Sequence, residues 1–328
     1  MSAREEAQRR FDAKTKPRGS LGRLEDLGCR IAEIRGFVPS WLECAIVVAA
    51  ADHGVAQDGV SAYPQAVTAQ MVANFAAGGA AINVLAREAG ARLVVVDVGV
   101  ATPTAHPDVQ SVRVAAGTAN MLERSAMTAE EAAAARAAGE ALAAELSDVD
   151  VVALGEMGIG NTTSAAAVTA ALLDLDPAAV CGPGTGLDAA GIARKTDVVR
   201  RAIELHRGAD PLASLGGLEL AFLAGVAIGC AARRIVVLLD GFITGVAALA
   251  AVRIEPDVRG VLIAAHRSPE PGHAYVLDAL GLEPLIDLGL RLGEGSGAAL
   301  AVPLLRSSIA ILRDMATFSE AGVTDAGR

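Results

Sequence analysis

The sequence has few aromatic residues and no excess of positive charge, and both features limit what the protein can be. Phe, Trp and Tyr make up 3% of its 328 residues and 52% are hydrophobic, so the core must consist mainly of Ala, Val, Leu and Ile. Such a core favours close packing of helices on a sheet over an aromatic-rich β-sandwich. The formal net charge of -10 argues against a nucleic-acid-binding surface, which would show clustered Lys and Arg. It does not exclude a local cationic pocket for a small anion.

The chain also has only four cysteines, and no two of them form a C-x-x-C pair. Their spacing indicates neither a zinc site nor a disulfide framework, and their apolar neighbours suit buried free thiols in a reducing compartment. The N-terminal segment is charged and has no apolar signal core. Glycines and charges interrupt the Ala-rich runs before about 18 residues, so no stretch qualifies as a membrane span. We therefore expect a soluble cytoplasmic protein. The cysteines are Cys29, Cys44, Cys181 and Cys230.

Short apolar runs rich in β-branched residues recur along the chain and predict strands. Most of them are uniformly apolar, which is typical of strands covered on both faces. They are Ala45–Ala51, Arg92–Val98, Asp150–Leu154, Ile235–Leu239 and Gly260–Ala264, with Pro284–Leu288 as a weaker sixth.

Ala-rich segments with helical periodicity lie between these runs, and the one at Thr128 opens with a capping box, TAEE. The alternation predicts an α/β fold with a doubly wound, mostly parallel sheet and helices on both faces. The predicted helices are Gln65–Glu88, Thr128–Leu146, Thr163–Leu175, Ala189–His206, Leu215–Ala232 and Gly297–Met315.

Both ends of the chain lack strands. Arg4–Thr15 and Leu21–Arg35 each have the pattern of a helix. At roughly 150 residues per domain, the length suits two domains, or one large domain with additions. We expect a large α/β catalytic domain over residues 37–304 and a small helical domain formed by residues 1–36 together with residues 305–328.

Glycine-flanked polar residues follow almost every predicted strand. In an open parallel sheet, ligands bind outside the carboxyl ends of the strands. These residues therefore gather at one edge and predict a single active site there. The segments are ADHGVAQDGVSAYPQ, DVGVATP, GEMGIGNTTS, DGFITG, AHRSPEPGH and GLRLGEGSG.

Two glycine-rich turns lead into helices at this edge. In GEMGIGNTTS (155–164) the glycines allow close approach to a ligand, and the helix N-terminus offers N–H groups to a phosphate. It matches neither G-x-G-x-x-G nor a Walker A loop, and the alternative is a tight turn with a Thr/Ser cap. In CGPGTGLDAAGIARK (181–195), Lys195 could supply a point charge for phosphate, or it could be a solvated helix lysine.

Three other stretches carry weaker signals. In DHGV (52–55), one Asp–His pair is too little for a zinc site, and a positioning or turn-bonding role fits better. In DGFITG (240–245), the pattern is close to the motif of diphosphate-dependent phosphoribosyltransferases, but Gly241 stands where their second acid would be. Tyr63, Gln70 and Met71 could line an apolar pocket or belong to the core.

Glu294 is a lone acid in LGLRLGEGSGAAL, between Gly293 and Gly295. A carboxylate in an apolar run costs folding free energy unless something offsets it. An apolar pocket would raise the pKa of Glu294 and make it a stronger base. Its position therefore predicts a general base.

Taken together, these motifs resemble the nicotinate-nucleotide–dimethylbenzimidazole phosphoribosyltransferase family, nearly end to end. The resemblance implies a Rossmann-like large domain, a small helical domain from both termini, and a homodimer with active sites near the subunit interface. The blocks that carry it are KPRGSLGRLEDL, ADHGVAQDGVSAYPQAVTAQMVANFAAGGAAINVLAR, GEMGIGNTTSAA, GTGLDAAGIARK, LGGLELAFLAG, DGFITG, AHRSPEPGH and LRLGEGSGAALA.

The resemblance also implies roles for individual residues. Glu294 matches the family's general base, and Glu156 and Lys195 match its other catalytic residues. The departures are Pro183, where Arg is expected, and Ala51, where Gly is expected. Phosphate and ribose binding is implied for Gly158, Gly160, Asn161, Thr162, Gly184, Thr185, Gly186, Ser268 and Gly295. The base pocket is implied around Ser61, Ala62, Tyr63, Gln70 and Met157.

The implied reaction transfers 5-phosphoribose from nicotinate mononucleotide to 5,6-dimethylbenzimidazole. It gives α-ribazole 5′-phosphate, for the lower ligand of cobalamin, and nicotinate. No metal and no cofactor are expected, because no diphosphate departs. One alternative is a family member that uses adenine, another benzimidazole or a phenol as acceptor. Another is a nucleotide-binding sensor without turnover. A nicotinamide-dependent dehydrogenase is disfavoured, since no G-x-G-x-x-G follows the first strand.

Overall fold

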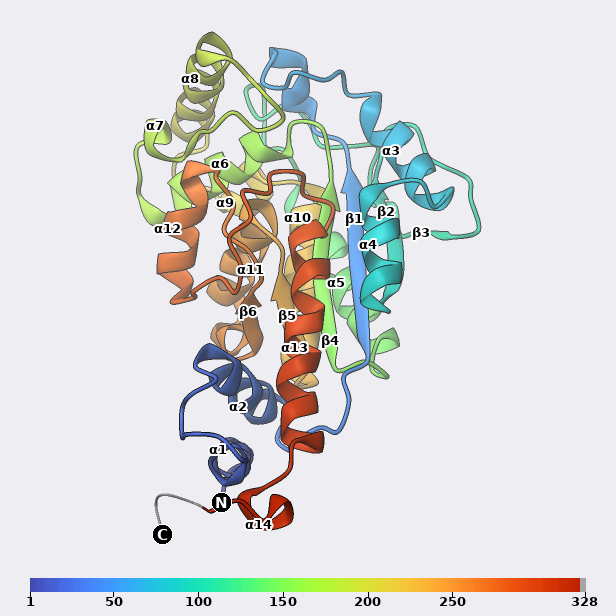
Figure 1. The fold of residues 1–328 in the computed structure, drawn as a ribbon. Coiled ribbons are helices and arrows are strands. Elements are labelled where there is room, and N and C mark those ends of the chain that lie inside the picture. Colours follow the sequence, from blue (N-terminus) through green and yellow to red (C-terminus); the bar gives the residue numbers. More distant parts are fainter. Residues whose placement is uncertain (325–328) are drawn as a thin grey trace.

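Six strands form one parallel sheet at the centre of the molecule, which a computed structural model describes over residues 1–324 (Figure 1). The spatial order is β3-β2-β1-β4-β5-β6, and every neighbouring pair is parallel. This confirms the predicted doubly wound α/β fold and makes the sheet parallel throughout. The strands are β1 (Cys44–Ala51), β2 (Arg92–Gly99), β3 (Val109–Ser111), β4 (Val151–Met157), β5 (Val236–Leu239) and β6 (Leu262–Ala264).

The strand order reverses between β1 and β4, which pair along their whole length from Cys44–Val151 to Ala50–Met157. The chain leaves β1 towards β2 and β3, and leaves β4 towards β5 and β6. The crevice at such a reversal is where ligands bind in open parallel sheets.

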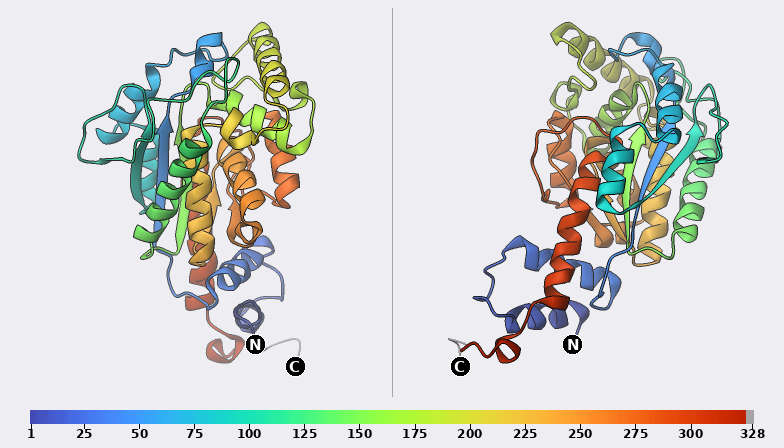
Figure 2. Two further views of the ribbon diagram at one scale, coloured as in Figure 1. Left: turned by 180° about the vertical axis from the view of Figure 1, so that it is seen from behind. Right: turned by 45° about the vertical axis from the view of Figure 1, so that its right-hand side comes forward.

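Helices cover both faces of the sheet (Figure 2). One face carries α3 (Val67–Ala76), α4 (Ala81–Ala89) and α13 (Ser296–Asp314). The other carries α5 (Ala129–Glu145), α10 (Leu218–Ala232) and α11 (Phe242–Ile254). The predicted capping box of α5 is present: Thr128 Oγ1 accepts from the Glu131 N–H and Glu131 Oε2 accepts from the Thr128 N–H. The remaining helices above and beside the sheet are α6 (Asn161–Leu173), α7 (Pro177–Val180), α8 (Ala189–Leu205), α9 (Pro211–Leu215), α12 (Pro271–Leu280), and the 3-10 helices η1 (Gly54–Asp58) and η2 (Pro256–Val261).

The structure corrects several predicted elements. Pro284–Leu288 is not a strand: only Ile286 forms an isolated bridge, to His266. The predicted helix Gln65–Glu88 is two helices, because Gly78 adopts a left-handed φ of 78° after α3 and breaks the hydrogen-bond ladder. The helix predicted from Leu215 begins at Leu218, after the separate turn of α9.

The N-terminal helices and the end of the chain lie together below the sheet (Figure 1). Helices α1 (Ala3–Ala13) and α2 (Arg23–Arg35) pack on each other and on α13, and α14 (Phe318–Ala321) follows. Lys16 and Glu25 form a buried ion pair there, 2.7 Å between Nζ and Oε1. Helix α13 runs across the predicted boundary at residue 304, and residues 325–328 of the predicted small domain lie outside the described part. The two-domain division stays a prediction.

Two segments are long and apolar enough to cross a membrane by length and composition, so the expectation that no stretch qualifies was wrong. One covers residues 67–89, which the structure divides between α3 and α4. The other is α13, which packs on α2, α4 and β4 and so has the contacts of a core helix. The four cysteines are buried and free, as expected.

Glycines let α5 and α10 approach each other closely. A Cβ at Gly225 would overlap the Arg136 carbonyl oxygen, and a Cβ at Gly139 would overlap the Phe222 carbonyl oxygen. The backbones therefore touch where most helix pairs are separated by side chains. This contact holds α10 flat against β1, β2, β4 and β5.

Gly225→Ala should destabilise the protein, because its methyl group meets backbone and not a flexible side chain. We expect a loss of about 1–3 kcal/mol in the free energy of unfolding, even though alanine has the higher helix propensity. Urea unfolding measures it, with Gly260→Ala as control because no atom lies within 4 Å of a Cβ there. Equal stability of the two variants would refute the close contact.

Candidate active site

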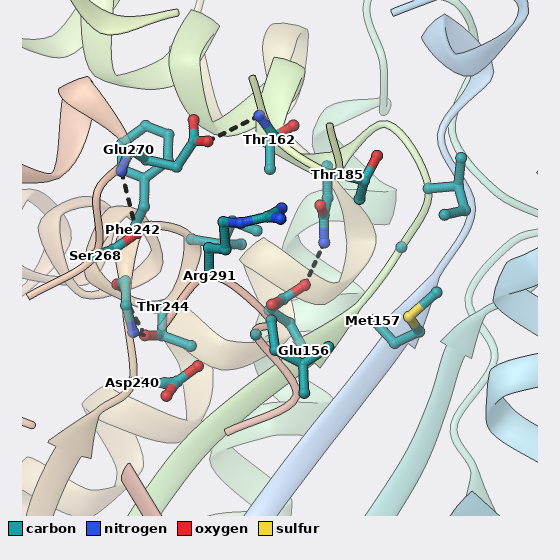
Figure 3. A pocket seen from close by; sticks show the side chains of 18 of the residues that line it. Glu156, Met157, Thr162, Thr185, Asp240, Phe242, Thr244, Ser268, Glu270 and Arg291 are labelled. Carbon is teal, nitrogen blue, oxygen red and sulfur yellow. Dashed lines mark hydrogen bonds between the residues drawn. The ribbon is translucent and has the colours of Figure 1, made fainter. Parts of the chain in front are cut away.

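One pocket lies at the carboxyl ends of β4, β5 and β6, where the predicted active site was placed (Figure 3). Its walls come from the start of α6, the turn around Gly184, the segments after β5 and β6, and the segment before α13. Its lining residues are Glu156, Met157, Gly158, Ile159, Asn161, Thr162, Gly184, Thr185, Asp240, Gly241, Phe242, Ile243, Thr244, His266, Ser268, Glu270, Arg291, Leu292 and Gly293.

Glu156 occupies one side of this pocket and is almost completely buried. Burial, and next the charge of Asp240, raise its pKa to about 8. A hydrogen bond from the Asn161 amide to Glu156 Oε2 opposes the shift and fixes the side chain (Figure 3). Gly293 lies against the other oxygen, where any Cβ would overlap it. Glu156 is therefore mostly protonated at neutral pH.

Lys195 lies fully buried beneath the pocket, with 0% of its surface exposed. Its Nζ donates to Thr162 Oγ1 at 2.9 Å and to the Gly182 carbonyl oxygen at 3.2 Å. Burial lowers the pKa of Lys195, and the nearby Glu270 carboxylate opposes this. The alternative of a solvated helix lysine is thus wrong. Lys195 does not line the pocket itself but ties the 181–187 turn to the first turn of α6.

The segment after β6 fixes the opposite side of the pocket. Glu270 Oε1 accepts from the Gly184 N–H at 2.8 Å, and Ser268 Oγ accepts from the Glu270 N–H at 3.3 Å. The Ser268 N–H donates to His273 Nδ1 at 2.9 Å. Burial lowers the pKa of His273 to about 4, so its ring is neutral and keeps this acceptor nitrogen. Ser268 and Gly184 are therefore held in fixed positions.

Glu294 is buried, and within the described residues its Oε2 has no hydrogen-bond partner. Burial raises its pKa, the Ile82 N–H lowers it, and the charge of Asp240 raises it. Its backbone is left-handed, with a φ of 62°. A Cβ at Gly155 would lie 2.6 Å from the Glu294 carbonyl oxygen, so the acid sits directly over β4. It does not line the pocket, but the adjoining Gly293 does.

The structure brings only part of the predicted site into this pocket. Ser61 is connected to it, since its Oγ lies 3.3 Å from Thr185 Oγ1, while Tyr63 is 54% exposed. Eight predicted residues line the pocket: Glu156, Met157, Gly158, Asn161, Thr162, Gly184, Thr185 and Ser268. Nine do not: Ser61, Ala62, Tyr63, Gln70, Gly160, Gly186, Lys195, Glu294 and Gly295.

The sequence reasoning missed most of the polar residues that β5, β6 and the final segment contribute. Arg291 is the clearest case. Within residues 1–324 no acid lies within ion-pair distance of it, and its side chain lies between the Glu270 side and the Glu156 side (Figure 3). The sequence offered one signal for Arg291, because it stands three residues before the glycine-flanked Glu294. The others include Asp240, Thr244, His266 and Glu270.

His53 of the DHGV turn is a buried hydrogen-bonding residue. Its Nε2 lies 2.6 Å from Glu219 Oε1, and its Nδ1 lies 2.9 Å from Ser164 Oγ. Gly158 packs directly on the ring. Among the residues that the structure describes, no group of three or more His, Cys, Asp or Glu side chains is placed to hold a metal ion.

Comparisons with known proteins were made on the whole chain. A family model described as "Phosphoribosyltransferase" matches residues 1–323. A protein from Pseudomonas aeruginosa (strain UCBPP-PA14) is 55% identical over 98% of this chain and 94% of its own length. A Chloroflexus aurantiacus protein is 52% identical over 97% and 93%. Both are named nicotinate-nucleotide–dimethylbenzimidazole phosphoribosyltransferase.

Solved structures agree with these relatives. The crystal structure of CobT from Thermus thermophilus matches with a TM-score of 0.94 and 48% identity, covering 99% of each chain. A second structure from the same organism, described as the same phosphoribosyltransferase, has a TM-score of 0.92 and 47% identity over 99% of each chain.

Glu156→Gln should change how stability depends on pH. Because the folded state holds the Glu156 proton up to about pH 8 and the unfolded state releases it near the ordinary glutamate pKa, this residue destabilises the wild type as pH rises between those values. The slope is about 1.4 kcal/mol per pH unit. The glutamine variant should lose this contribution.

Urea unfolding between pH 5 and pH 8.5 measures the effect. The exposed Glu145→Gln serves as the matched control and should follow the wild type. If Glu156→Gln kept the wild-type dependence, the raised pKa of Glu156 would be wrong.

Proposed function

The chain belongs to the nicotinate-nucleotide–dimethylbenzimidazole phosphoribosyltransferase family, and we propose on that premise that it transfers 5-phosphoribose from nicotinate mononucleotide to 5,6-dimethylbenzimidazole. The products are α-ribazole 5′-phosphate, for the lower ligand of cobalamin, and nicotinate. The observation that carries the proposal is a single pocket whose two sides differ in chemistry. One side carries hydroxyl groups, a helix N-terminus and Arg291, which suit a phosphate, and the other carries Glu156 and Met157.

The phosphate side combines several anion-binding features. The N-terminus of α6, a helix of 13 residues, lies at the pocket wall, where its first residues Asn161 and Thr162 line the pocket and its positive end is available to an anion. Ser268 and Thr185 offer hydroxyl groups, and Gly184 lets the backbone come close. Arg291 supplies an exposed cation, which suits bidentate contact with phosphate. Lys195 acts from below, by orienting Thr162 and by its charge.

The acceptor side lies towards β1. Met157 lines the pocket there, and Glu294 sits over β4 beside Gly293. Ser61 reaches this region through Thr185. We place the flat aromatic base between Met157 and Gly293, next to the residue Glu294, whose Oε2 has no hydrogen-bond partner in the described chain. The predicted base-pocket residues Ala62, Tyr63 and Gln70 are exposed, so they would contact the base only if it extends towards α3.

The chemistry needs one proton acceptor. One ring nitrogen of the base attacks C1′ of the ribose, and the bond from C1′ to the pyridine nitrogen breaks, with its electron pair staying on nicotinate. Glu294 accepts the N–H proton from the other ring nitrogen, so no cation builds up on the product. Attack opposite the leaving group converts a β-nucleotide into an α-riboside. Nicotinate leaves as a neutral pyridine with its carboxylate and needs no acid or metal to help it.

Glu156 suits a positioning role on the sugar. At neutral pH it is mostly protonated, so it can donate as well as accept a hydrogen bond. The pyridinium of the substrate would favour its ionised form and lower its pKa. An ionised Glu156 would then stabilise the positive charge that develops on the ribose.

The remaining proposals concern assembly and location. Exposed Val84 on α4 and Leu300 on α13 belong to helices that pack side by side, and Leu292 lies beside the pocket. These apolar side chains support a homodimer in which the active site lies near the partner. Four buried free thiols support a reducing, cytoplasmic location.

Mass spectrometry of the products tests the activity directly. With nicotinate mononucleotide and equimolar dimethylbenzimidazole, adenine and phenol, we expect nicotinate release and one dominant riboside phosphate, that of dimethylbenzimidazole. A dominant product from another acceptor would revise the substrate, and binding without any release of nicotinate would indicate a sensor.

Glu294→Gln should reduce turnover by about 10²–10⁴-fold, because the amide cannot take the proton. Steady-state rates at pH 7.5 measure it, with unfolding curves to establish that the variant is folded. Glu283→Gln, an exposed acid that pairs with Arg23 of α2 and does not line the pocket, is the control. Wild-type turnover in a folded Glu294→Gln protein would exclude the general-base role.

A further inference from the structure

Asp240 is a buried acid at the centre of the site that the proposed reaction leaves without a role. It follows β5 directly, is 2% exposed, and lines the pocket (Figure 3). It stands in DGFITG, where the sequence lacks the second acid of diphosphate-dependent enzymes. A metal-binding pair is therefore not what keeps an acid at this position.

Asp240 holds the first turn of α13 from outside the helix. Its Oδ1 accepts from the Gly297 N–H at 2.7 Å and from the Ala298 N–H at 3.1 Å. The N-cap residue of α13 is Gly295, which has no side chain to satisfy these donors. The carboxylate also faces the positive end of the helix dipole. The segment carrying Glu294 is thus fixed to the sheet by an acid on a neighbouring strand.

His266, which follows β6, holds the same segment at its other end. Its Nε2 lies 3.3 Å from the Leu290 carbonyl oxygen, so this nitrogen carries a proton and donates it. Its Nδ1 lies 3.6 Å from Asp240 Oδ1 and has no hydrogen-bond partner in the described chain. Gly297 packs flat on the ring, where a Cβ would overlap Nδ1. Leu290 and Gly297 bracket the whole turn that contains Gly293, Glu294 and Gly295.

Several titratable groups face Asp240. Glu156 comes from β4, Glu294 from the segment before α13, and His266 from the segment after β6, while α13 presents its N-terminus. Burial raises the pKa of Asp240, and His266 and the α13 N–H groups lower it. The charge of Asp240 raises the pKa of both Glu156 and Glu294.

We propose that Asp240, together with His266, is a positioning residue of the reaction: it fixes the Glu294 turn beside the pocket and places a carboxylate near the two catalytic acids. The role rests on the proposed function only in calling those acids catalytic. By its hydrogen bonds Asp240 sets where Glu294 lies. By its charge it adds to burial, which is the larger cause, in raising the pKa of both Glu156 and Glu294.

Two substitutions separate the hydrogen bonds from the charge. Asp240→Asn keeps an oxygen that accepts from Gly297 and Ala298 but removes the charge. Asp240→Ala removes both. Asp97→Asn is the matched control, because Asp97 is also a buried acid, near the carboxyl end of the parallel strand β2, is bonded to a backbone N–H (Val100, 2.8 Å), and lies outside the pocket.

Amide hydrogen exchange tests the positioning without any turnover. Asp240→Ala should speed exchange of the Gly297 and Ala298 amides by roughly 10- to 100-fold, the factor expected when a hydrogen bond to a charged acceptor is lost. Asp240→Asn should stay close to the wild type, and Asp97→Asn should equal it. Unchanged exchange in Asp240→Ala would overturn the positioning role.

The pH profile tests the charge. In Asp240→Asn the acid limb of kcat/KM should move to lower pH, by roughly one unit, because the pKa values of Glu294 and Glu156, which both act in their ionised forms, fall. The fall in stability linked to Glu156 should end at a lower pH by the same amount, because it starts at the unfolded-state pKa and stops at the folded-state pKa, and this readout needs no substrate. An unmoved acid limb together with an unmoved stability profile would overturn the electrostatic role. Absence of turnover in the wild type would instead refute the proposed function, while exchange and stability would still decide the role of Asp240.

Discussion

The pocket depends on one constraint: a parallel sheet buried on both faces delivers every strand's carboxyl end to the same edge. Residues 44 to 51 of β1 are all buried, so no polar side chain can be placed along the strand itself. The polar groups of the pocket lie at or just beyond the carboxyl ends of the strands, at Glu156, Asp240 and His266. Neighbouring parallel strands lie about 4.8 Å apart, so three successive strand ends bring these groups together without any long-range sequence signal.

Gathering acids at a buried edge costs folding free energy, and the structure shows where that cost stays uncompensated. Glu219, Glu270 and Glu294 each keep one carboxylate oxygen without a hydrogen-bond partner in the described chain. An acid without a function would not be retained in such a place, because burying an unpaired polar group costs a few kcal/mol of folding free energy. The uncompensated oxygens border the pocket or the residues beneath it. Protons and ligand hydroxyl groups are what such oxygens would bind.

The sequence was most informative where chain chemistry alone decides the structure. The uniformly apolar runs predicted five of the six strands. The rule that ligands bind outside the carboxyl ends of parallel strands predicted the position of the pocket. Prediction from the sequence failed where contacts between distant segments decide the local structure. Val109–Ser111 is a strand only because β2 lies beside it, and Ile286 forms only a bridge because little of its segment meets His266. For Lys195 the sequence left open a phosphate contact or a solvated helix lysine, because helical spacing says nothing about which turn will cover its end. Arg291 was passed over because its exposure to the pocket depends on how the following turn is held.

That turn carries the strongest sign that the site is built for chemistry. Gly293, Glu294 and Gly295 have φ values of 80°, 62° and 85°, so three successive residues are left-handed. Glycine would suit the middle position best, and a glutamate there costs of order 1 kcal/mol. Folding alone would remove both the strain and the buried charge by a Gly at this position. The chain instead surrounds the strained acid with glycines at 155, 293, 295 and 297, which give it room, and with Asp240 and His266, which hold it. Glu294 is held from both ends of its turn, and its Oε2 makes no hydrogen bond within the described chain. We infer that the residue is retained because this oxygen acts on a ligand.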